Sequence, residues 1–210
     1  MKVLLLNGSP HKEGCTYTAL KEMEKEFQKE GIETEIFYIG TDAIAPCRAC
    51  GACNKLKKCV VDDKVNEFIQ VMKECDGLVI GSPVHYASAS GVIAPFLDRA
   101  FYAGSRAGKD TFTHKPGTSI VSARRAGTTA TLDQLNKYFA INQMPIISGR
   151  YWNMVHGSTP EDVLKDEEGL QNMRFVARNM IYHLKCKEAG AKAGILPPEQ
   201  EEVIKTNFIK

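Results

Sequence analysis

The sequence predicts an α/β domain in which a parallel sheet is covered by helices on both faces. Short apolar runs alternate with amphipathic stretches five times along the 210 residues. Continuous apolar runs are typical of strands that are buried on both faces, as in parallel sheets. Several of these runs end in Gly, Ser or Pro, which favour turns. Repeated strand–helix alternation therefore indicates a parallel sheet whose strands are connected by crossing helices.

The first strand and helix set the pattern for the chain. Val3–Leu6 is an apolar run that predicts a buried strand, and it ends at Asn7-Gly8-Ser9-Pro10. A helix is expected to begin near Thr16, with apolar residues on one face, and to stop at Gly31. Glu33–Ile39 alternates between polar and apolar residues, which predicts the second strand.

The middle of the chain contributes a third strand between two helices. Asp62 and Asp63 are suitable caps for the first of these helices. Leu78–Ile80 is a short apolar run and predicts the third strand. Ser90 can open the next helix, in which Pro95 fits only within the first turn or at a bend.

The remaining chain adds two strands and two helices. Gly117–Val121 predicts the fourth strand, and a helix with an apolar face follows it. The fifth strand is expected to begin at Pro145–Ile147. Thr159, followed by a proline and two acids, predicts a helix start, and this helix is expected to run to about Lys187.

Composition indicates a cytoplasmic protein with one domain. Hydrophobic residues make up 43% of the chain, charged residues 25%, and the formal net charge is +2. This charge is too small to indicate binding to nucleic acid or to an anionic membrane. No apolar run approaches the roughly 20 residues of a membrane span, and the N-terminal run is too short for a signal peptide. We expect one domain over residues 1–190 and a C-terminal extension over residues 191–210.

Three loops are expected to meet beyond the carboxyl ends of the strands, where sheets of this type bind ligands. They are residues 9–16, 83–91 and 122–129. In the first loop Ser9 and Thr16 offer hydroxyls, and the amides of a helix start favour an anion. This loop predicts a cradle for one phosphate, although a simple capped turn would have the same composition. It matches neither of the glycine-rich nucleotide motifs G-x-G-x-x-G and G-x-x-x-x-G-K-[ST].

The second and third loops are able to hold a flat ring between them. His85 and Tyr86 would lie against one side of the ring, and Gly127-Thr128-Thr129 would cover the other side. Arg124 and Arg125 follow the fourth strand. They are either solvated, or one of them binds a phosphorylated reductant such as NADPH.

A cysteine-rich loop follows the second strand. Four of the seven cysteines share the spacing C-x2-C-x2-C-x5-C, and they are Cys47, Cys50, Cys53 and Cys59. Four thiolates at such spacings hold iron–sulfur clusters, and four ligands also suit zinc. Arginine and lysine residues among the cysteines would favour thiolates. A cluster, a zinc ion and unmetallated thiols are all open readings. Cys75 and Cys186 are expected to be buried apolar groups in helices.

Five short motifs stand at the ends of the predicted strands and in the helix after the third strand. They are Asn7-Gly8-Ser9-Pro10, Gly14-Cys15-Thr16, Gly81-Ser82-Pro83-Val84-His85-Tyr86, Phe96-Leu97-Asp98-Arg99 and Gly127-Thr128-Thr129. Over about residues 1–150 the chain resembles the NAD(P)H-dependent FMN reductase family, and its cysteine run resembles the compact motif of the iron–sulfur flavoproteins. The resemblance implies a flavodoxin-like three-layer sandwich with a five-stranded parallel sheet in the order 2-1-3-4-5. Cys15 departs from it, because the family often has Asn there.

The resemblance also implies a cofactor and its site. FMN would bind non-covalently, with its phosphate on residues 9–16 and its ring between residues 83–86 and 122–128, in a homodimer or homotetramer. The implied cofactor-binding residues are Ser9, Pro10, His11, Lys12, Gly14, Cys15, Thr16, Pro83, Val84, His85, Tyr86, Ser122, Arg124, Gly127 and Thr128. Because flavin carries the redox chemistry, no catalytic side chain is predicted.

The expected function is an FMN oxidoreductase. It would take electrons from NAD(P)H and pass them to a quinone, another flavin or a different small acceptor. One alternative is an iron–sulfur flavoprotein, with a [4Fe-4S] cluster on the four cysteines, that exchanges electrons with small molecules or redox proteins. A non-enzyme alternative is a zinc-binding interaction module. A receiver-type signalling domain is disfavoured, because Ser82 stands where such a domain needs an acid nucleophile.

Overall fold

The structure is a computed structural model that describes residues 1–204 and 206–208. Its strands are β1 (Lys2–Asn7), β2 (Glu33–Tyr38), β3 (Gly77–His85), β4 (Ser88–Ala89), β5 (Gly117–Ala123) and β6 (Met154–His156). Its helices are α1 (Cys15–Lys29), α2 (Cys53–Leu56), α3 (Lys64–Lys73), α4 (Ile93–Ala107), α5 (Thr128–Ile141), α6 (Pro160–Val163) and α7 (Glu167–Lys192), with a short 3₁₀ helix at Lys109–Thr111.

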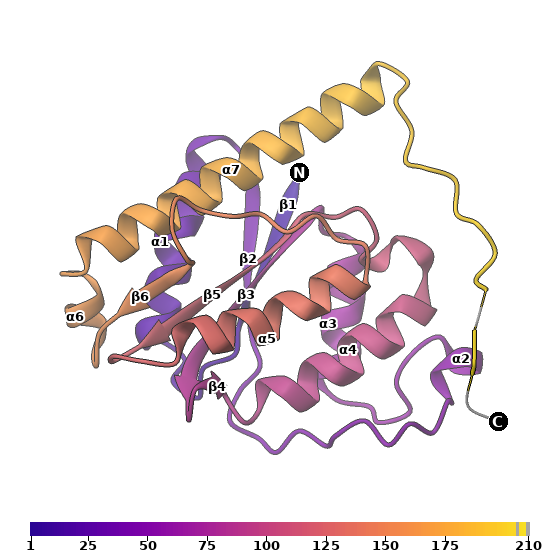
Figure 1. Cartoon of the computed structure of the whole chain (residues 1–210), viewed down its shortest axis with the longest axis horizontal. Coiled ribbons are helices and arrows are strands. Elements are labelled where there is room, and N and C mark those ends of the chain that lie inside the picture. The colour runs from indigo at the N-terminus through magenta and orange to yellow at the C-terminus, as the bar shows by residue number, and fades with distance from the viewer. Residues whose placement is uncertain (205, 209–210) are drawn as a thin grey trace.

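The sheet confirms the predicted fold class. Neighbouring strands run β2-β1-β3-β5-β6, and each of these pairs is parallel. The order differs from the prediction in one respect, because β4 is an additional two-residue strand that pairs antiparallel with β3. Without β4, the five parallel strands follow the predicted order along the chain. Figure 1 shows helices on both sides of this sheet.

The edge strand begins later than predicted. Ile146 forms only an isolated bridge with Gly117, and the regular strand β6 starts at Met154. Residues 148–152 loop out between these two points. The buried side chain of Asn172 holds the loop, because its Oδ1 accepts hydrogen bonds from the Arg150 and Tyr151 amides. A side chain on α7 thus satisfies backbone groups that a longer strand would have paired.

Two of the predicted helices have different bounds in the structure. Thr159 caps a helix as expected, through a capping box with Asp162, but α6 ends after one turn and Asp166 caps α7 as a separate helix. Helix α4 begins at Ile93, because the Ser90 hydroxyl donates instead to the Gly8 carbonyl, at 2.6 Å. Pro95 therefore falls in the first turn, where a missing N–H removes no intrahelical bond.

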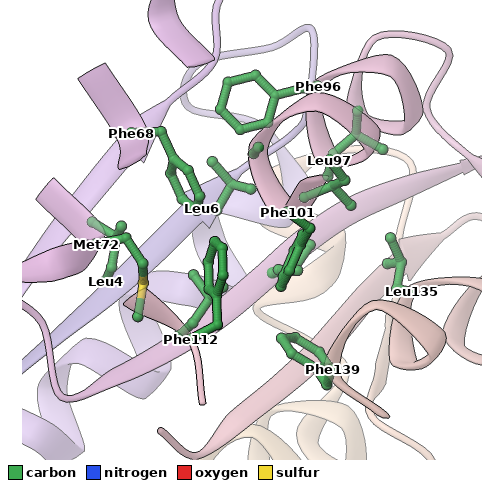
Figure 2. Close-up of a cluster of buried hydrophobic side chains, with 14 of the residues drawn as sticks. Leu4, Leu6, Phe68, Met72, Phe96, Leu97, Phe101, Phe112, Leu135 and Phe139 are labelled. Carbon is green, nitrogen blue, oxygen red and sulfur yellow. The ribbon is translucent and has the colours of Figure 1, made fainter. Parts of the chain in front are cut away.

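The core has two layers, one on each side of the sheet. Leu4 and Leu6 of β1 face the layer formed by α3, α4 and α5, and Figure 2 shows these side chains among buried phenylalanines. Val3 and Leu5 face the opposite layer, which α1 and α7 cover. Every second residue of β1 thus enters the same layer, as the two-residue period of a strand requires. Burial of both faces explains the continuous apolar run that predicts this strand.

The long helix α7 packs along α1 (Figure 1) and continues past it. After Lys192 the described residues have no regular secondary structure, and the division into residues 1–190 and 191–210 stays a prediction. No helix in the described part combines the length and apolar character needed to cross a membrane. Cys75 is buried as expected, but it lies just after α3 and not within a helix. Cys186 is exposed, because it lies on the outer face of α7 beside exposed Tyr182.

Candidate functional site

The three predicted loops lie at one edge of the sheet. Strands β1, β3 and β5 are parallel neighbours, so their carboxyl ends, and the loops that follow them, share this edge (Figure 1). The Gly8 amide donates to the Gly81 carbonyl at 2.8 Å, and Pro83 pairs in register with Ser122. The topology thus brings the three loops together at the place where sheets of this type bind ligands.

The first loop is shaped by buried polar groups. The side chain of Asn7 accepts a hydrogen bond from the Ser9 amide at 3.1 Å and donates to the Lys12 carbonyl at 2.9 Å. The Ser9 hydroxyl in turn accepts from the His11 amide at 3.1 Å. These bonds fix the loop by contacts within the chain, so it has a defined shape before any ligand binds.

The start of α1 is open to an anion. Its cap is Gly14, no side chain caps the first turn, and the first turn contains no acidic residue. The amides of a first helical turn have no partners within the helix and carry partial positive charge. Thr16 in this turn and Ser9 on the loop before it are buried, while His11 and Lys12 are exposed on the loop. The chemistry of this donor set fits a phosphate group.

A buried hydroxyl pair joins the first loop to the third. Thr16 Oγ1 lies 2.8 Å from Ser122 Oγ at the end of β5, and both residues are buried. Each hydroxyl has two lone pairs and one proton, so the pair still has capacity for a further acceptor or donor. The contact fixes the distance between the phosphate cradle and the loop that is predicted to cover the ring.

Cys15 lies at the first position of α1, and its thiol donates to the Gly157 carbonyl at 3.7 Å. Burial, assisted by the charges of Asp162 and Glu161, raises the pKa of Cys15, so the thiol stays neutral at pH 7. The contact places the end of β6 beside the first loop. Sequence reasoning missed this neighbour, because the predicted fifth strand lay several residues too early.

The second loop is a tight hairpin between β3 and β4. His85 pairs with Ser88, and the two residues between them, Tyr86 and Ala87, have φ of 52° and 56°. Positive φ at both central positions is the geometry of a type I′ turn, which normally selects Asn and Gly. His85 and Tyr86 are exposed at its tip. Gln134 of α5 anchors the hairpin, because its side chain accepts hydrogen bonds from β4.

The third loop packs directly against this hairpin. Gly127 has φ of 92°, and a Cβ at this position would lie 2.7 Å from Ala87 Cα. Only glycine therefore allows the two loops to approach this closely. Arg124 and Arg125 are exposed, and α5 starts after Gly127 with no capping side chain and no acid in its first turn. The edge therefore presents exposed guanidinium groups to any anionic ligand.

The four cysteines of the second candidate site all line one cavity of about 40 Å³, together with Arg99 and Tyr102 of α4. Cys53 is buried, Cys59 is half-buried, and Cys47 and Cys50 are exposed. Within the described residues, no three His, Cys, Asp or Glu side chains are arranged so that they could hold a metal ion. The number and kind of donors fit a four-thiolate centre, but the cysteines would have to rearrange to form one.

Comparison with known proteins decides the family. The family of NADPH-dependent FMN reductases matches residues 1–159. An iron–sulfur flavoprotein from Methanocaldococcus jannaschii is 31% identical over 186 residues, which are 86% of this chain and 95% of that protein. The chain belongs to the NADPH-dependent FMN reductase family. The resemblance predicted from the sequence motifs is thus confirmed, and the family supports FMN-dependent oxidoreduction.

Solved structures of flavoproteins share the fold of this FMN reductase family member. RosB with bound 8-demethyl-8-formylriboflavin-5'-phosphate has a TM-score of 0.70 at 15% identity and covers 100% of this chain and 92% of its own. FerB, an NAD(P)H:acceptor oxidoreductase from Paracoccus denitrificans, has a TM-score of 0.63 at 17% identity, with coverages of 88% and 97%. Identities this low show the fold alone. A flavodoxin, WrbA-like protein from Agrobacterium tumefaciens, with a TM-score of 0.59 at 11% identity and coverages of 88% and 97%, shows that it is the predicted flavodoxin-like fold.

Proposed function

We propose that this protein binds FMN at the three-loop edge and uses it to pass electrons from NAD(P)H to a small acceptor such as a quinone or another flavin. The observation that carries the proposal is the convergence of the uncapped start of α1 with the two loops that pack on each other at the same edge. Family membership and the flavoprotein names of the relatives support it.

The first loop has the groups that a phosphate needs. In the proposed complex the FMN phosphate accepts hydrogen bonds from the first-turn amides of α1 and from the buried hydroxyls of Ser9 and Thr16. Lys12 lies on the same loop and adds positive charge. The isoalloxazine ring would lie against residues 83–86 and 122–128 and not between them, because the two segments contact each other at Val84 and Gly127. There the hairpin and the third loop support it through backbone and apolar contacts.

FMN supplies the redox chemistry, since it accepts two electrons with a hydride and releases them singly or in pairs. The residues of the chain then bind and orient the FMN and shield it from water. Arg124 and Arg125 are exposed next to the proposed ring site, where their charge favours approach of a phosphorylated nicotinamide. FerB, which shares the fold, is named for its use of NAD(P)H, which supports the same donor here. A homodimer or homotetramer stays a prediction that light scattering would test.

A second candidate function is an iron–sulfur flavoprotein that carries single electrons. The observation that favours it is that Cys47, Cys50, Cys53 and Cys59 line one cavity. The relative from Methanocaldococcus jannaschii carries the name iron–sulfur flavoprotein. In this version a [4Fe-4S] cluster on the four thiolates would connect an external donor with FMN.

The deciding experiment compares FMN with riboflavin, which lacks the phosphate. Protein purified without oxygen is titrated with each flavin, and binding is followed by the quenching of flavin fluorescence. We expect stoichiometric FMN binding and at least tenfold weaker riboflavin binding, because the start of α1 is built for an anion. Equal binding of the two flavins would contradict the assignment of the first loop as a phosphate site. If neither flavin bound, the proposed function would be wrong. Iron and sulfide analysis of the same sample tests the second candidate.

A further inference from the structure

Arg99 is a buried charged residue that the proposed flavin chemistry does not use. It lies in α4, and its side chain is only 1% exposed. Burying a guanidinium is unfavourable unless its donors are satisfied by hydrogen bonds and an opposite charge. The partners of this one side chain therefore show which part of the molecule it serves.

Within the part of the chain that the structure describes, its side chain donates hydrogen bonds to residues 45–63, the segment that carries the cysteine motif. Both terminal nitrogens donate to the Asp63 carboxylate, at 2.6 and 2.9 Å, and one of them also donates to the Val61 carbonyl at 3.0 Å. A longer contact of 3.4 Å reaches the Ala45 carbonyl, which precedes the first cysteine of the motif. Arg99 Nε donates to Cys59 Sγ at 3.3 Å. One arginine thus holds both ends of the cysteine loop against α4.

Cys59 is also fixed through its backbone. The buried side chain of Asn66 accepts a hydrogen bond from the Cys59 amide at 2.9 Å and donates to the Cys59 carbonyl at 3.0 Å. Cys47 and Cys50, in contrast, are exposed on the loop. The last cysteine is therefore held in place from three directions, while the first two lie at the surface.

We propose that Arg99 is the positioning residue of the cysteine site: it holds Cys59 Sγ at the cavity and, by donating to that sulfur, raises the reduction potential of a cluster bound there. The proposal rests on the second candidate function. A hydrogen bond to a ligating sulfur stabilises the reduced, more negative state of a cluster, and such neighbours orient ligands. An ion pair with Asp63 alone would not need Nε to face a sulfur.

The test uses the same substitution at two positions of α4. Arg99→Lys keeps the positive charge, but one nitrogen cannot reach both the carboxylate and the sulfur. Arg106→Lys is the matched control, because Arg106 also contacts the cysteine motif, at Asn54, but it is not buried and does not contact a sulfur. Asp63→Asn removes the ion pair, keeps a good helix cap for α3, and leaves the donor to Cys59 in place.

The first readout is the cluster potential in the reconstituted protein, measured by redox titration of the visible absorbance. We expect Arg99→Lys to shift the one-electron equilibrium at least tenfold toward oxidation, or about 59 mV. Arg106→Lys should leave it unchanged, and Asp63→Asn should leave it unchanged or raise it. A normal potential in Arg99→Lys at full iron content would overturn the tuning role. Equal, lowered potentials in Arg99→Lys and Asp63→Asn would mean that the ion pair acts only as a structural support.

The second readout needs no cluster. In metal-free protein, hydrogen–deuterium exchange of residues 57–63 reports how firmly Cys59 is held. We expect exchange to be at least tenfold faster in Arg99→Lys than in the wild type or Arg106→Lys. Unchanged exchange would overturn the positioning role. If no variant and no wild-type sample binds iron, the cluster function and the tuning role fail together, and the exchange result alone decides positioning.

Discussion

At the scale of single residues, Cys15 occupies the first position of α1, at the proposed phosphate site. A neutral thiol is a weak hydrogen-bond donor, and here it already contacts the Gly157 carbonyl. A substitution at this position can add a donor or a charge at the start of α1, and it leaves the buried hydroxyls of Ser9 and Thr16 unchanged.

We predict opposite effects for two substitutions of nearly equal size at this position. Cys15→Asn adds an amide donor and should tighten FMN binding by about fivefold, the value of one hydrogen bond of about 1 kcal/mol. Cys15→Asp places a negative charge at the anion site and should weaken FMN binding at least tenfold. Riboflavin binding should change little in either variant, which provides the control. FMN binding to Cys15→Asp as tight as that of the wild type would show that the phosphate lies elsewhere.

At the scale of elements, the three loops can be predicted from their neighbours in sequence. The start of β6 and the residues that it brings to the site depend on contacts between distant parts of the chain, which the sequence pattern does not reveal. The first loop follows an apolar run and precedes an amphipathic helix, so its place in the fold can be read from its neighbours in sequence. The late start of β6 depends on Asn172, which bonds to the amides of Arg150 and Tyr151 from more than twenty residues further along the chain. The contact of Cys15 with Gly157 depends in turn on that strand. The hairpin after β3 was missed because Tyr86 and Ala87 are not the residues that type I′ turns select.

The strained hairpin leads to a prediction about stability. Non-glycine residues in the left-handed region are strained by about 1–3 kcal/mol. Ala87→Gly should relieve part of this strain and raise the melting temperature by roughly 2–4 °C for each kcal/mol gained. FMN affinity should not increase, because the looser hairpin must be ordered again on binding. Ala126→Gly, in the neighbouring loop and without a positive φ, should not raise stability. Calorimetry of the two variants would contradict the strain argument if both melted at the same temperature.

At the scale of the whole molecule, α7 is attached to α1 by ion pairs as well as by the core. Glu22 accepts from Arg174 at 2.5 Å, and Glu26 accepts from Arg178 at 2.7 Å. Burial alone would raise the pKa of Glu26, but hydrogen bonds from Arg178 and Lys29 outweigh it, so its pKa lies below the ordinary value of 4.5. The same balance lowers the pKa of Glu22. Since α1 also opens the proposed phosphate site, its attachment to α7 supports that site.

These carboxylates make part of the stability dependent on pH. A carboxyl whose pKa is lowered by folding contributes stability above its unfolded pKa, and this contribution is lost as the pH falls through the folded value. The loss should therefore occur below about pH 4.5. We predict that Glu26→Gln is less stable than the wild type at pH 7 and that the difference shrinks below pH 4.5. Urea unfolding at several pH values measures it. Glu33→Gln removes an exposed carboxylate from β2 and should keep the wild-type dependence on pH. A difference for Glu26→Gln that persists down to pH 3 would mean that packing of the side chain, and not its charge, connects α7 to α1.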